Sequence, residues 1–141
     1  MSEKKIRLLL NRSVHVGSCD FPARDLAEVE QNYTNYVELL TTVTTHCPHA
    51  KLIISSVLPR HGKMAATINE QIADLNTRLA RLAEEDNIVF IDNDIHFKDH
   101  AGVIGQLYKA KDRSGVHIND AGKMRLGSSI LDALKSTLST V

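Results

Sequence analysis

Apolar side chains recur at steps of three and four residues in three parts of the chain, which is the period of one face of an α-helix. The first part runs from Asp25 to Val43, the second from Thr67 to Leu82, and the third from Asn119 to Leu138. We predict a helix over each of these ranges. The last helix is expected to bury Met124, Ile130, Leu131, Leu134 and Leu138.

The starts of these segments carry residues that favour helix N-termini. Asp25 with Glu28, and Thr67 with Glu70, have the spacing of a capping box, in which two side chains bond to the exposed amide hydrogens of the first turn. Asn119 is a favoured N-cap residue. We therefore expect the helices to start at Asp25, Thr67 and Asn119.

Shorter apolar runs precede or separate the helices and predict three strands. They cover Ile6–Val16, Lys51–Leu58 and Asn87–Asn93. The second run is continuously apolar and stops at Pro59, which is typical of a strand buried on both faces of a sheet. Alternation of strands and helices predicts a single domain over residues 1–141, a three-layer α/β/α sandwich with a parallel sheet.

The composition excludes several classes of partner. Lysine plus arginine equals aspartate plus glutamate, 17 against 17, so no net charge attracts nucleic acid or an anionic membrane surface. No apolar run has the length of a membrane span or of a signal-peptide core. Cys19 and Cys47 have no metal-ligand spacing and fit a reducing compartment, so we expect a cytoplasmic protein without metal or other cofactor.

Ligands of open parallel sheets bind beyond the carboxyl ends of the strands, and this rule selects three places in the chain. They are Gly17–Asp20, Leu58–Gly62 and Asp92–Asp94, the last followed by a long glycine-bearing loop. His117 ends that loop just before a predicted helix, which makes it the candidate functional histidine among seven. The other six are expected to be solvated loop or helix-end residues, His46, His49, His61, His96 and His100, or a packed core residue, His15.

Five sequence blocks in order carry a specific resemblance. They read SVHVGSCD, EVEQNYTNYVELL, CPHAKLIISSVLPR, INEQIADLNTRLARLAEEDNIVFID and GVHINDAGKMRLGSSIL. In order and spacing they resemble the SGNH/GDSL hydrolase family, from about Ser13 to Leu134. The resemblance implies the flavodoxin-like fold of that family and an ester substrate, such as an acyl or acetyl group on a lipid or sugar.

The last block resembles the part of the family that carries the catalytic base. His117 matches the family's histidine, which takes a proton from the nucleophile. The family's aspartate, three residues before that histidine, falls on Ser114, which cannot supply a negative charge. Asp112 lies two residues earlier and can replace that aspartate only if the loop is rearranged.

The first block resembles the part that stabilises the oxyanion. The family's Gly-x-Asn-Asp sequence falls on Gly17, Ser18, Cys19 and Asp20, so a thiol replaces the asparagine, and a thiol is a poorer hydrogen-bond donor than an amide. Cys19 is also a candidate nucleophile, because the resemblance implies that it shares a pocket with His117.

The family's Gly-Asp-Ser nucleophile block has no counterpart, since only 12 residues precede SVHVGSCD. The resemblance therefore implies an N-terminally truncated fold, and a sheet edge left open for a homodimer partner or a partner strand. Three functions stay open. The domain is a degenerate esterase kept for binding or assembly, an active esterase that uses His117 with Cys19 or with a partner chain's serine, or a small-ligand-binding module.

Overall fold

The computed structural model describes residues 26–62, 65–84, 87–112 and 115–139. In chain order the elements are α2 (Leu26–His46), β1 (Leu52–Ser55), α3 (Ala65–Leu82), β2 (Ile88–Ile91), α4 (Asp94–Phe97) and α5 (Asp120–Ser139). The predicted strand Ile6–Val16, the Gly17–Asp20 turn and Asp25 lie outside the described residues.

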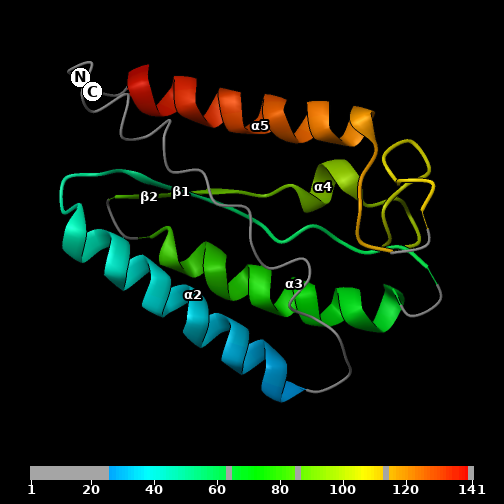
Figure 1. The fold of residues 1–141 in the computed structure, drawn as a ribbon, viewed down its shortest axis with the longest axis horizontal. Helices are drawn as coiled ribbons and strands as arrows, with labels where there is room; N and C mark the ends of the chain where they lie inside the picture. Colours follow the sequence, from blue (N-terminus) through cyan, green and yellow to red (C-terminus); the bar gives the residue numbers. More distant parts are fainter. Residues whose placement is uncertain (1–25, 63–64, 85–86, 113–114, 140–141) are drawn as a thin grey trace.

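The described elements form three layers. β1 and β2 pair in parallel, with Leu52 opposite Ile88 and Ser55 opposite Ile91. Helices α2 and α3 lie on one side of this pair and α5 lies on the other (Figure 1). The predicted α/β/α arrangement with a parallel sheet is confirmed.

The main core lies between α3, α2 and the sheet. Ile72, Leu75 and Leu79 of α3 have no exposed surface, and their spacing of three and four residues places them on one helix face. They pack with Val29 of α2 and Ile54 of β1. Each such side chain contributes about 1.5–3 kcal/mol when it leaves water, so α3 is the element that holds the sheet to its helical layer.

Two of the predicted helix starts can be compared with the structure. Asn119 is confirmed as the cap of α5, because its Oδ1 accepts a hydrogen bond from the Gly122 amide at 2.9 Å. The prediction for Thr67 is wrong: α3 already begins at Ala65, whose amide donates to the Gly62 carbonyl. Gly62 has a φ of 101°, a conformation that favours glycine, and the turn it makes starts the helix early.

The predicted buried face of α5 is wrong at two positions. Met124 is 76% exposed and Leu131 is 50% exposed. The buried positions of this helix are Gly122 and Thr137, with Leu126 half-buried between them. Three other predicted residues, Ile130, Leu134 and Leu138, are half-buried, so the inward side of the helix combines small residues with large apolar ones.

None of the helices in the described part of the chain has the length and apolarity needed to cross a membrane.

Candidate active site

A hairpin at the carboxyl end of the sheet presents the candidate base. Lys109 and Ile118 form an antiparallel bridge. On either side of it the Ala110 amide donates to the His117 carbonyl at 3.1 Å, and the Asn119 amide donates to the Tyr108 carbonyl at 2.8 Å. His117 therefore stands on the returning arm of this hairpin, two residues before α5 is capped.

Asp112 faces His117 across the same hairpin. The distance from Asp112 Oδ2 to His117 Nδ1 is 2.6 Å, within the range of a charge-assisted hydrogen bond. The side chains are 47% and 64% exposed, respectively, so the pair lies at the surface, where a substrate has access. This contact brings Asp112 to the ring of His117, and the replacement of the family's aspartate by Asp112 stays a prediction. Ser114 lies outside the described residues.

The hydrogen bond to Asp112 decides which ring nitrogen of His117 can act as a base. An ionised carboxylate accepts a hydrogen bond from Nδ1–H, so the neutral ring carries its proton on Nδ1 and its lone pair on Nε2. When Nε2 takes up a proton, the negative charge of Asp112 stabilises the resulting imidazolium. The pair thus has the geometry of a base with its orienting carboxylate.

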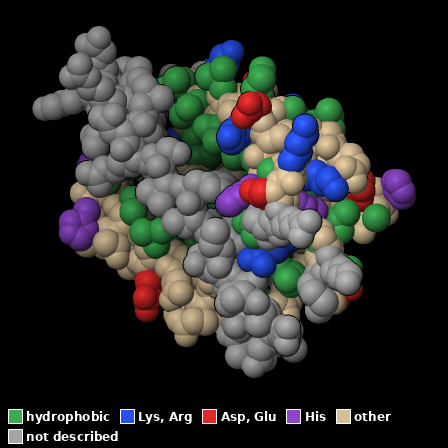
Figure 2. All heavy atoms as spheres, turned by 45° about the vertical axis from the view of Figure 1, so that its right-hand side comes forward, with side chains coloured by type: hydrophobic (Ala, Val, Ile, Leu, Met, Phe, Trp, Pro, Cys, Tyr) green, Lys and Arg blue, Asp and Glu red, His purple; other side chains and the backbone are tan. Residues whose placement is uncertain are grey.

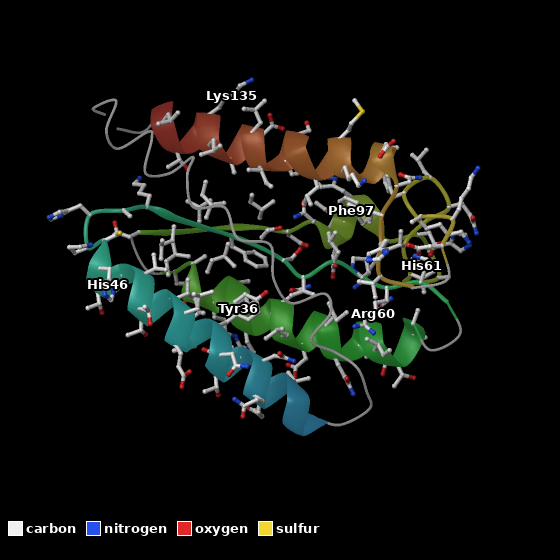
Figure 3. The ribbon with its side chains drawn as sticks, in the orientation of Figure 1. Tyr36, His46, Arg60, His61, Phe97 and Lys135 are labelled. Atoms are coloured by element: carbon white, nitrogen blue, oxygen red, sulfur yellow. The ribbon has the colours of Figure 1, made fainter. Side chains whose placement is uncertain are left out.

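The loop that follows β1 contacts the hairpin directly. The His61 amide donates to the Gly115 carbonyl at 2.9 Å, and His61 Nε2 lies 3.3 Å from the His117 carbonyl. His61 points into the loop cluster at this end of the molecule, near Arg60 and Phe97 (Figure 3). His61 lies in a loop, as predicted, and is half-buried there. The Leu58–Gly62 loop and His117 share one edge of the sheet.

Gly115 lets these two loops approach closely. Its φ is 72°, and a Cβ built on it would lie 2.5 Å from the His61 carbonyl oxygen. Any larger residue would therefore push the two backbones apart.

The segment after β2 ties the strand ends together. Asn93 is fully buried. Its backbone amide donates a hydrogen bond to Ser56 Oγ at 2.9 Å, and its side-chain Nδ2 donates one to Ser55 Oγ at 2.6 Å. Asp94 then opens α4 and pairs with Lys98 at 2.7 Å. The sequence analysis predicted a loop here and missed α4. The Asp94–Lys98 pair stabilises this short helix, because residues four apart lie on the same side of one helical turn.

His96, predicted to be a solvated loop or helix-end residue, lies in the last turn of α4 and is half-buried. Its Nδ1 lies 2.6 Å from a terminal guanidinium nitrogen of Arg125 on α5. Since arginine is always protonated, His96 Nδ1 is the acceptor. The contact fixes α4 against the start of α5, beside the hairpin.

Histidine, acidic and basic side chains gather next to one another on the face of the molecule that contains these loops (Figure 2). In the described part of the chain, no group of three or more histidine, cysteine, aspartate or glutamate side chains could hold a metal ion. Gly17, Ser18, Cys19 and Asp20 lie outside the described residues, so their distance to His117 stays a prediction.

A comparison with protein families identifies the family of this domain. The model of the GDSL-like Lipase/Acylhydrolase family matches residues 13–125, more than half of the chain. The chain belongs to this family. No curated protein matches the sequence.

Solved structures share the fold at low sequence identity. A GDSL-like lipase from Bacteroides thetaiotaomicron is 19% identical with a TM-score of 0.61, over 77% of this chain and 53% of that one. A protein from Bacteroides fragilis assigned as an acylhydrolase is 23% identical with a TM-score of 0.63, over 78% and 53%. The chain therefore spans about half the length of these bacterial structures.

A third similar structure is the esterase domain of the ORF1 protein from the zebrafish ZfL2-1 retrotransposon. It is 24% identical with a TM-score of 0.63, over 86% of this chain and 66% of that one. At these identities the structures establish the fold, and the chemistry rests on this chain's own residues.

Proposed function

We propose that this domain supplies the base of a carboxylic-ester hydrolase, with His117 as the general base and Asp112 as the carboxylate that orients it. The observation that carries the proposal is the 2.6 Å contact between Asp112 Oδ2 and His117 Nδ1 at the carboxyl end of the sheet. The family membership of the chain supports an acyl ester as the substrate class.

Acylation needs two proton transfers at one atom, and deacylation repeats both. His117 Nε2 first takes the proton of the nucleophile, which then attacks the ester carbonyl carbon and forms a tetrahedral oxyanion. The same Nε2 next gives that proton to the departing alkoxide, and the acyl group stays on the nucleophile until water, activated by His117 in turn, releases it. Asp112 holds the ring in place throughout and stabilises its charged form.

The nucleophile has two candidate sources, a partner chain and Cys19. The sequence contains no Gly-Asp-Ser block. A partner chain can supply the serine, or Cys19 can act as the nucleophile, because a thiolate beside an imidazole is a competent attacking group.

The alternative function is a degenerate domain that binds a small ester or sugar ligand, or acts in assembly, without turnover. It is favoured by the two substitutions at the family's positions, Cys19 for the oxyanion asparagine and Ser114 for the aspartate. Loss of one oxyanion donor typically costs about 100- to 1,000-fold in turnover, so activity measurements must reach low rates.

Hydrolysis of p-nitrophenyl acetate by the purified chain separates the two functions. We expect measurable turnover that His117→Ala lowers at least about 100-fold, the usual contribution of a general base. His49→Ala is the matched control, since His49 is exposed in the turn before β1, at the opposite end of the sheet, and should leave the rate unchanged. Turnover that is equal in both variants, or that stays absent when a partner chain carrying the serine is added, would favour the degenerate domain.

Cys19→Ser and Cys19→Ala identify the nucleophile in the same assay. If Cys19 attacks the ester, both variants lose turnover and the wild-type chain is inactivated by iodoacetamide. If a serine from a partner chain attacks, turnover appears only when that partner is added, rises with its concentration, and is the same in the two variants as in the wild-type chain.

A further inference from the structure

Two asparagines on α3 hold the segment after β1 by the same pair of hydrogen bonds. Asn76 Oδ1 accepts from the Val57 amide at 2.8 Å, and its Nδ2 donates to the Val57 carbonyl at 2.9 Å. Asn69 makes the same two bonds with Arg60. Its Oδ1 accepts from the Arg60 amide at 2.6 Å, and its Nδ2 donates to the Arg60 carbonyl at 3.0 Å. Both side chains are buried, at 7% and 4% exposure, so their amide groups depend on these bonds.

Asn69 differs from Asn76 in holding a second loop as well. Its Nδ2 also donates to the Gly102 carbonyl at 2.9 Å. The Ile104 amide donates to the same Arg60 carbonyl at 3.2 Å. One side chain therefore fixes the loop after β1 and the loop after α4 against each other.

The position of Arg60 determines the position of the hairpin. Its neighbour His61 bonds to the Gly115 carbonyl through its amide, and its ring lies within hydrogen-bond distance of the His117 carbonyl. Gly115 leaves no spare room at this contact. A shift of the Arg60 backbone is thus passed through His61 to the residue that carries the base, whereas Val57, held by Asn76, belongs to the buried core.

We propose that Asn69 is a positioning residue for His117, acting through the Arg60–His61 backbone. Its role in turnover rests on the proposed function, and its effect on the geometry of His117 does not. Because a misplacement of about 1 Å can cost about 100-fold in rate, a residue that touches no substrate can control the reaction from this distance.

The matched variants Asn69→Asp and Asn76→Asp test this role. Each keeps the acceptor for a backbone amide and replaces the NH₂ donor with an oxygen that faces a backbone carbonyl. We expect both variants to lower the melting temperature. Only Asn69→Asp should shift the ring resonances of His117 in NMR spectra and lower kcat for p-nitrophenyl acetate, by about 10- to 100-fold, with KM changed less than twofold.

His61→Ala keeps the test decisive if Asn69→Asp does not fold. It removes the ring contact to His117 and retains the backbone bond to Gly115, so it should fold and still shift the His117 resonances. The proposal would be overturned if the His117 resonances stayed unchanged in both Asn69→Asp and His61→Ala. If Asn69→Asp does not fold, unchanged His117 resonances in His61→Ala alone would overturn it. Equal losses of kcat in the Asn69 and Asn76 variants would also overturn it.

The two readouts separate this proposal from the function on which it rests. Shifted His117 resonances in a chain without His117-dependent turnover would support the positioning role and contradict the hydrolase. His117-dependent turnover that is insensitive to Asn69→Asp would support the hydrolase and contradict the positioning role.

Discussion

His117 and Asp112 are five residues apart, yet their side chains meet because the chain reverses between them. The family's spacing of three residues requires a different turn, and Ser114 occupies that position here. At the scale of single residues the site depends on this reversal and on Gly115, where two loops approach too closely for a side chain.

Gly115→Ala should therefore destabilise the protein. A non-glycine residue at a φ of 72° costs about 1–2 kcal/mol, and the contact of its Cβ with the His61 carbonyl adds to this. Urea unfolding measures the loss in the free energy of unfolding.

Gly127→Ala is the control for that measurement. Gly127 lies within α5 and has no atom within 4 Å of a built Cβ, so alanine should stabilise the helix by about 0.5–1 kcal/mol. Equal effects of the two substitutions would show that the close contact at Gly115 is absent.

Among the elements, α3 has the largest structural role. One of its faces carries the fully buried Ile72, Leu75 and Leu79, and the same helix provides both asparagines that hold the segment after β1. Helix α5 covers the other side of the sheet and leaves Leu131 at the surface.

Leu75→Ala and Leu131→Ala should thus differ sharply in their effect. Removing the buried Leu75 side chain leaves a cavity and costs about 2–5 kcal/mol. Leu131→Ala should change the free energy of unfolding by less than about 0.5 kcal/mol, the usual range for an exposed site. Thermal unfolding of both variants checks this, and a large loss for Leu131→Ala would mean that α5 is covered in solution.

The sequence predicted the elements whose pattern is local. The apolar period of α3 and the cap at Asn119 were predicted correctly because neighbouring residues determine them. The parallel pairing of the runs after Lys51 and Asn87 followed from the alternation of strands and helices. The bonds of Asn69 to Arg60 and Gly102 could not be predicted, since they join segments 9 and 33 residues apart. In α5, the apolar period alone did not distinguish the exposed Met124 and Leu131 from the half-buried positions.

As a whole, the molecule is a three-layer domain that spans about half the length of similar bacterial structures. In the described residues, β1 and β2 pair only with each other. An open strand edge favours pairing with another chain. We therefore propose that the isolated chain forms a homodimer through a sheet edge.

Analytical ultracentrifugation across a range of concentrations measures this association. We expect a sedimenting species of twice the chain's mass of 15.6 kDa at high concentration. A chain that stays monomeric throughout would contradict the homodimer.

The most direct test of the hydrolase is the kcat/KM of Asp112→Asn relative to the wild-type chain on an acetyl ester. Asparagine keeps the size of the side chain and removes the charge that orients and stabilises the His117 ring. We expect kcat/KM to fall about 100- to 10,000-fold while the melting temperature stays within a few degrees. An unchanged kcat/KM would contradict the role of Asp112 and, with it, the assignment of His117 as the base.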